Sequence, residues 1–199
     1  MYLTRFLVNH SRVALGWISN PYRVHQRLRM AYPNEPRLLF RIEESSAGSQ
    51  ILAQSVAKPE WKSAFMDFDI LVTEPETKEF VLKLVSGGLY RFRLLANPVV
   101  TRDGKRLGLL NEEVQRAWLD RQMEKAGAKS LGCQVKDNGL LHSKKNPDKD
   151  TGIQVHQSVL YDGVLQVVER EKLEHSLATG IGPGKGYGFG LLSLAPYRN

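Results

Sequence analysis

Cysteine is nearly absent from this sequence of 199 residues. The single Cys133 cannot form an internal disulfide and cannot supply a set of thiolate ligands, which excludes a disulfide framework and a cysteine-rich zinc site. Long apolar runs are also absent: no stretch reaches 18 apolar residues, and residues 13–18 are too few for the core of a signal peptide. We therefore expect a cytoplasmic protein, with no membrane partner, that folds by packing alone.

Acidic residues are scarce at the start of the chain. Residues 1–41 hold seven arginines against one acid, Glu35, a net charge of +6, whereas the other 158 residues contribute +1 to the total of +7. The planar guanidinium group binds phosphate oxygens in a bidentate manner. This concentration favours a site for a polyanion, although a solvated basic face without a ligand would give the same pattern.

Length and composition fit a folded chain. With 42% hydrophobic and 25% charged residues, the sequence is close to the average for globular proteins. The order of expected elements repeats once along the chain. We expect an α+β fold of two tandem ferredoxin-like domains with antiparallel sheets, each with the order β-α-β-β-α-β, covering residues 1–96 and 97–199. Two helices then cover one face of each sheet, and the other face is free to bind.

Turn and cap residues place the elements. In the first half we expect strands at residues 2–8, 37–43, 50–56 and 67–73, helices at 21–32 and 59–65, and a hairpin of strands 80–85 and 89–96. In the second half we expect helices at 111–127 and up to Thr179, strands at 130–135 and 191–195, a lysine-rich loop at 136–151, and a hairpin of strands 153–161 and 164–168 that turns at Asp162-Gly163.

The helix at residues 21–32 has a clear start. Asn20 is a good N-cap and Pro21 suits the first helical position, while Tyr32-Pro33-Asn34 stops the helix. At about 100° per residue, Val24, Leu28 and Ala31 form a buried stripe.

The same periodicity places Tyr22, His25 and Arg29 together on one flank of this helix. An imidazole takes or gives a proton near neutral pH, and an arginine balances the charge of a phosphorane, so the trio suits phosphodiester cleavage. A boundary histidine without a catalytic role is the ordinary alternative.

Glycine occupies every second position from Gly180 to Gly190, six of eleven residues. Backbone N–H groups in such a segment can approach an anion closely, and Lys185 adds a positive charge at its centre. The segment follows a helix and precedes a strand, which is the wrong context for a nucleotide-binding P-loop. We expect it to bind phosphates, and a bend packed tightly on a neighbouring helix is the alternative.

Metal ligands are not grouped. His10, His142, His156 and His175 show no metal-ligand spacing, and Asp67 and Asp69 alternate on one expected strand, as on an exposed face. The sequence therefore predicts no cofactor and argues against a two-metal nuclease.

Several motifs along the whole chain are typical of one family. They are Met1-Tyr2-Leu3-Thr4, Asn20-Pro21-Tyr22-x-x-His25-x-x-Leu28, Arg91-Phe92-Arg93-Leu94-Leu95-Ala96-Asn97-Pro98, Val159-Leu160-Tyr161-Asp162-Gly163, Gly180-Ile181-Gly182-Pro183-Gly184-Lys185, and Gly188-Phe189-Gly190-Leu191-Leu192-Ser193-Leu194-Ala195-Pro196. With these motifs the sequence resembles the CRISPR precursor-RNA processing endoribonucleases of type I-E systems, the CasE subunit of Cascade, within the RAMP superfamily.

The resemblance implies an enzyme that binds the stem-loop of CRISPR repeat RNA and cuts once at the 3′ base of the stem without metal. It carries Tyr22 and His25 into the active site, where His25 is the general base or the acid. The ribose 2′-OH attacks the adjacent phosphate and leaves a 2′,3′-cyclic phosphate and a 5′-OH. The expected partners are the crRNA, which the enzyme retains, and the other Cascade subunits.

Further residues are expected to hold the RNA. Because side chains cannot easily read the deep, narrow major groove of an RNA stem, phosphate contacts should dominate. The RNA-binding residues that we predict are Arg23, Arg27, Arg29, Lys144, Lys145, Gly182, Gly184, Lys185 and Gly186. Arg29 rests on helix geometry alone, and Lys144 and Lys145 on their place in a basic hairpin.

Two other functions are compatible with these features. A non-catalytic RNA-binding or scaffolding subunit of the same complex would have the same fold and the same basic surface. A small-molecule phosphate enzyme is disfavoured because the nucleotide motif is missing.

Overall fold

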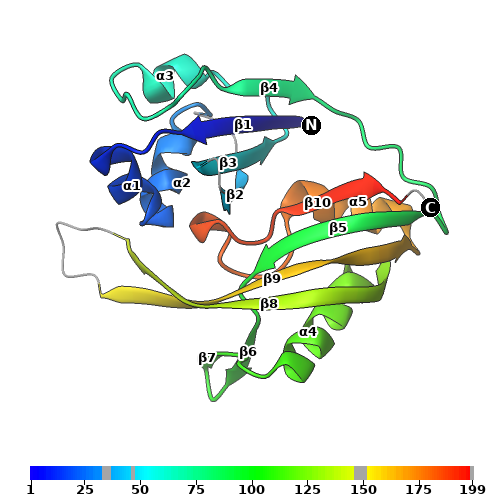
Figure 1. Ribbon diagram of the computed structural model, residues 1–199. Helices are drawn as coiled ribbons and strands as arrows, with labels where there is room; N and C mark the ends of the chain where they lie inside the picture. Colours follow the sequence, from blue (N-terminus) through cyan, green and yellow to red (C-terminus); the bar gives the residue numbers. More distant parts are fainter. Residues whose placement is uncertain (33–36, 46–47, 146–151, 198–199) are drawn as a thin grey trace. The chain divides into compact units, whose positions relative to one another are not determined.

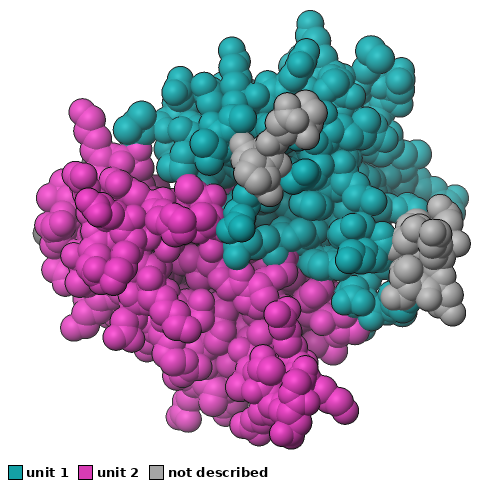
Figure 2. Space-filling model, turned by 180° about the vertical axis from the view of Figure 1, so that it is seen from behind, with its two compact units in different colours: residues 1–81, 142–154, 185–188 teal, residues 82–141, 155–184, 189–199 magenta. Residues whose placement is uncertain are grey.

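The computed structural model describes residues 1–32, 37–45, 48–145 and 152–197 (Figure 1). They form two compact units, coloured separately in Figure 2. The chain enters each unit more than once. Unit 1 comprises residues 1–81, 142–154 and 185–188, and unit 2 comprises residues 82–141, 155–184 and 189–199. The domain boundary expected between residues 96 and 97 stays a prediction.

Unit 1 contains a four-stranded antiparallel sheet with the strand order β2-β3-β1-β4. The strands are β1 (Tyr2–Val8), β2 (Leu39–Ser45), β3 (Gly48–Ser55) and β4 (Glu76–Glu79), and the helices are α1 (Arg12–Ile18), α2 (Pro21–Arg29) and α3 (Trp61–Phe65). Phe6 and Ile51 are opposite each other in β1 and β3 and are fully buried. Val24 and Leu28 of α2 join the same core, which confirms the predicted stripe.

Unit 2 contains the second four-stranded sheet, with the order β10-β5-β9-β8. Its strands are β5 (Leu89–Ala96), β8 (Ala128–Lys144), β9 (Ile153–Val167) and β10 (Leu192–Pro196), its helices are α4 (Glu112–Lys125) and α5 (Arg170–Thr179), and a small hairpin is made of β6 (Val99–Arg102) and β7 (Lys105–Gly108). The last residues of β8 and the first of β9 are grouped with unit 1, as is the short 3-10 helix η1 (Lys185–Tyr187).

Both sheets follow the order β-α-β-β-α-β, with α1 and α2 together in the place of the first helix of unit 1. This arrangement is ferredoxin-like, and the α+β prediction is confirmed. No helix within the described ranges is long and apolar enough to cross a membrane.

The predicted hairpin at Asp162-Gly163 is wrong, because β9 runs straight through these residues. Gly163 is paired with Phe92 of β5, and a Cβ on it would overlap the carbonyl oxygen of Gly132. The glycine therefore permits a close backbone approach within the sheet, and it makes no turn. The loop predicted at residues 136–151 is also wrong up to Lys144, since β8 extends that far; residues 146–151 lie outside the described ranges.

The strands predicted at residues 67–73 and 80–85 are not found; Leu71 forms only an isolated bridge with Val8. The edge strand is β4, whose residues are all exposed. Its sequence, Glu-Thr-Lys-Glu, has no apolar alternation, so only pairing with β1 identifies it. The helix predicted to reach residue 32 ends at Arg29, and Pro33 and Asn34 lie outside the described ranges.

Candidate active site

Helix α2 presents the chemically active side chains of unit 1. Asn20 precedes it with extended backbone angles (φ −119°, ψ 91°), and Pro21 occupies its first turn. Because Val24 and Leu28 are completely buried, the flank with Tyr22, His25 and Arg29 is left half-buried at the surface. Tyr22, His25 and Arg29 therefore share one partly exposed flank of α2, as the helical periodicity predicts.

The imidazole of His25 lies among aromatic rings. Its ring centroid is 6.1 Å from that of Tyr22 and 6.1 Å from that of Phe40, with which it stacks at an interplanar angle of 25°. The backbone of η1 passes close by, since a Cβ on Gly186 would lie 3.7 Å from His25 Nδ1. Phe40 and Gly186 thus restrict the orientation of the imidazole.

The surroundings of His25 disfavour its charged form. Burial lowers the pKa of His25 from its ordinary value of 6.5, and the positive charge of Arg29 lowers this pKa further. The neutral imidazole, with one nitrogen free to accept a proton, is consequently the dominant form at neutral pH.

A second phenol stands beside Tyr22, and sequence reasoning missed it. The rings of Tyr22 and Tyr187 are 5.6 Å apart between centroids at an angle of 33°. Burial raises the pKa of the Tyr187 phenol, and Tyr22 raises it further. Tyr187 therefore stays protonated at neutral pH. The available signal was its place within the glycine-rich segment, two residues after Lys185.

Lys185 and Arg37 supply positive charge in unit 1. Burial lowers the pKa of the Lys185 ammonium group, and the neighbouring Arg37 guanidinium lowers it further. Two cations that repel each other form a setting in which a bound phosphate is favourable. Arg37 lies within the arginine-rich start of the sequence but was not among the predicted binding residues.

Gly182 and Gly184 lie in unit 2 and have a packing role there. Their φ angles are +74° and +86°, and a Cβ would lie 3.0 Å from the Trp118 ring at the first and 2.9 Å from the Phe189 ring at the second. Both positions require glycine for conformation and space. Their binding of phosphate stays a prediction.

The remaining predicted RNA-binding side chains lie in different settings. Arg23 is exposed, and Arg27 is half-buried, donating to the carbonyl oxygen of Ala64 at 3.0 Å with its guanidinium 4.4 Å from the centroid of the Phe68 ring. Lys144 and Lys145 are exposed at the end of β8. The two contacts of Arg27 direct its side chain toward α3 and the loop that follows it.

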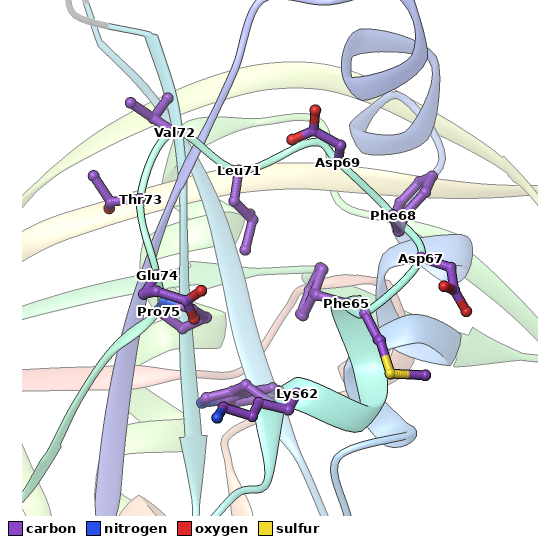
Figure 3. Close-up of a pocket in the computed structure, with 12 residues that line it drawn as sticks. Lys62, Phe65, Asp67, Phe68, Asp69, Leu71, Val72, Thr73, Glu74 and Pro75 are labelled. Atoms are coloured by element: carbon purple, nitrogen blue, oxygen red, sulfur yellow. The ribbon is translucent and has the colours of Figure 1, made fainter.

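A separate pocket of about 630 Å³ lies between α3 and β4. Phe65 and Leu71 point into it, and the acids Asp69 and Glu74 stand along the loop that surrounds it (Figure 3). These carboxylates repel phosphate groups, so the pocket is not the place for RNA. Asp67 and Asp69 lie on this loop, so the strand that was predicted to carry them is wrong.

Comparison with known proteins agrees with the family resemblance that the sequence motifs indicate. The family model described as "CRISPR associated protein" matches residues 1–196. The chain is 34% identical to the CRISPR-associated endoribonuclease Cse3 of Thermus thermophilus and 30% identical to the CRISPR system Cascade subunit CasE of Escherichia coli, and both alignments cover 98% of this chain and 100% of the relative.

A solved structure is similar over nearly the whole chain. It is that of Thermus thermophilus Cse3 bound to an RNA representing a pre-cleavage complex, with a TM-score of 0.82, 32% identity and 98% coverage of each chain. On the strength of the full-length family match and of relatives at 30% identity and above, this chain belongs to the CRISPR-associated protein family.

Proposed function

We propose that this protein is an endoribonuclease that binds the stem-loop of CRISPR repeat RNA and cleaves precursor crRNA at the 3′ base of the stem. The observation that carries the proposal is the cluster of Tyr22, His25 and Tyr187 at the surface of unit 1, in a chain whose relatives are named CRISPR endoribonuclease and Cascade subunit. Product retention, association with other Cascade subunits and a cytoplasmic location belong to the same proposal.

In the proposed reaction the nucleophile belongs to the RNA. The ribose 2′-OH attacks the adjacent phosphorus, the bond to the 5′ oxygen breaks, and the products are a 2′,3′-cyclic phosphate and a 5′-OH. Neutral His25 takes the proton of the 2′-OH, because its lowered pKa keeps a nitrogen available. In this proposal the phenol of Tyr22 or of Tyr187 donates a hydrogen bond or the proton that the leaving oxygen needs.

The cations of unit 1 stabilise the negative charge that develops in the transition state. Arg29 lies on the flank of His25, and Lys185 and Arg37 lie near each other. A phosphorane carries more negative charge than the phosphodiester, so fixed cations stabilise it more strongly than the substrate. This scheme needs no metal ion, and metal independence is a part of the proposal.

The decisive experiment is single-turnover cleavage of a repeat RNA by the wild type and by His25→Ala. We expect the variant to lose about 10² to 10⁴ in rate while its affinity for the stem-loop stays nearly unchanged. The products should carry a cyclic phosphate, a 2′-deoxy nucleotide just upstream of the cut should block the reaction, and a chelator should leave the wild-type rate unchanged.

Each arm has an outcome against the proposal. Full activity of His25→Ala removes His25 from the mechanism, and cleavage of the 2′-deoxy RNA indicates an activated water as the nucleophile. Tight binding without cleavage by the wild type identifies a non-catalytic RNA-binding subunit instead.

A further inference from the structure

We infer that Asn20 is a positioning residue that fastens the basic end of the β8–β9 hairpin to the start of α2. The inference rests on the proposed function, and it concerns how Lys144 and Lys145 are held relative to the helix of Tyr22 and His25. All the residues involved belong to unit 1.

The side chain of Asn20 does not do what an N-cap side chain ordinarily does. An N-cap oxygen usually accepts from a backbone N–H of the first turn. Ser11 accepts in this way from the backbone N of Ala14 at 3.1 Å, and Asn111 from that of Glu113 at 2.8 Å. Asn20 stands at the N-cap of α2 and makes no such bond. Its carboxamide is directed elsewhere.

Both ends of that carboxamide bind the hairpin. Ser143 donates its hydroxyl to Asn20 Oδ1, and Asn20 Nδ2 donates to the carbonyl oxygen of Lys144 at 3.1 Å. The partners are 123 and 124 residues away along the chain. Ser143 is only 3% exposed, so its hydroxyl needs this acceptor, whereas the next side chains, Lys144 and Lys145, are exposed.

An asparagine suits this double role. Its side chain offers a donor and an acceptor side by side, so one residue can bind a hydroxyl and a carbonyl. Tyr22 follows two residues later and His25 five residues later. A phosphate held by the lysines is therefore held at a fixed place relative to the imidazole, and cleavage depends on such placement.

Asn20→Ser separates this role from helix capping. Serine caps a helix as well as asparagine does but is too short to reach both partners. We expect Asn20→Ser to weaken binding of an uncleavable 2′-deoxy repeat stem-loop about tenfold, as the loss of two hydrogen bonds implies. Ser143→Ala, which removes one of the two bonds, should weaken it by a smaller factor.

The effect of Asn20→Ser should depend on whether Lys144 and Lys145 are present. A general loss of structure would not produce this dependence. In the background of Lys144→Ala and Lys145→Ala, Asn20→Ser should change the dissociation constant by less than about twofold, because the two cations that Asn20 positions are then absent. The matched control is Asn111→Ala, which removes a true N-cap of α4. It should lower the melting temperature and leave the lysine-dependent part of binding unchanged.

The outcomes separate the two levels of inference. If Asn20→Ser lowers affinity equally with and without the lysines, or leaves it at the wild-type value, Asn20 does not position the hairpin. If the wild type itself neither binds nor cuts repeat RNA, the proposed function fails instead.

Discussion

His25 is the residue on which the proposed chemistry depends, and its protonation is set by its neighbours. Burial and Arg29 both lower its pKa. Since a general base is active when neutral, the rate should rise with pH and then level off, and the midpoint of the rise should lie below the ordinary pKa of 6.5.

Arg29→Gln tests that dependence. The substitution removes a positive charge, so it should raise the pKa of His25 and move the rising limb of kcat/KM to higher pH. The pH profile of kcat/KM reports groups of the free enzyme and is the suitable measurement. Arg23→Gln, on the exposed side of α2, is the control and should leave the limb in place. A limb that falls as pH rises would make His25 the acid.

The sequence predicts one half of this residue cluster and misses the other half. Tyr22, His25 and Arg29 are within one helix, where a period of 3.6 residues determines which side chains share a flank. Phe40 and Tyr187 reach His25 and Tyr22 from β2 and η1. Tyr187 is 165 positions away from Tyr22, and no local pattern records a tertiary contact of that length.

Helices and strands differ in how well their own residues predict where they begin and end. Pro21 marks the first turn of α2, and the capping side chain of Asn111 marks the start of α4, because such signals act over one turn. The start of α1 was overlooked although Ser11 caps it. Strand β4 depends on β1 for its pairing, with Arg5 bound to Glu76 at 2.8 Å, and its own residues do not predict it.

The glycine-rich segment allows a prediction at this scale. Gly184→Ala places a Cβ at φ +86° and 2.9 Å from the Phe189 ring, so it should destabilise the fold by about 1–3 kcal/mol. Gly186→Ala meets only an ordinary contact of 3.7 Å with His25 Nδ1 and should cost less than about 1 kcal/mol.

Denaturant unfolding and single-turnover cleavage together separate the two glycines. The methyl group of Gly186→Ala occupies space beside the imidazole, so cleavage should fall about tenfold or more although stability is kept. Equal destabilisation by the two substitutions would contradict this division of roles.

Charge acts at the scale of the whole molecule. The total is +7, of which +6 lies in residues 1–41. Lys144 and Lys145 add to the positive charge of unit 1, where Lys185 and Arg37 also lie. Such a distribution attracts RNA by releasing counterions, and the affinity should fall steeply as salt rises.

The double variant Lys144→Ala with Lys145→Ala measures how much the hairpin contributes to the salt-dependent binding of RNA. The slope of log Kd against log salt concentration should decrease by about 1 to 2, because each phosphate contact contributes nearly one unit. Lys125→Ala with Lys129→Ala removes two exposed cations from unit 2 and serves as the control. An identical slope in both double variants would show that the hairpin does not contact phosphate.

The pairing of Tyr187 with Tyr22 has a consequence for how the protein folds. These two rings pack together although 165 positions separate them along the chain. Bringing such distant residues together costs loop-closure entropy, so contacts of this kind form late. A refolding chain should therefore regain its helices and strands before it regains the tyrosine pair.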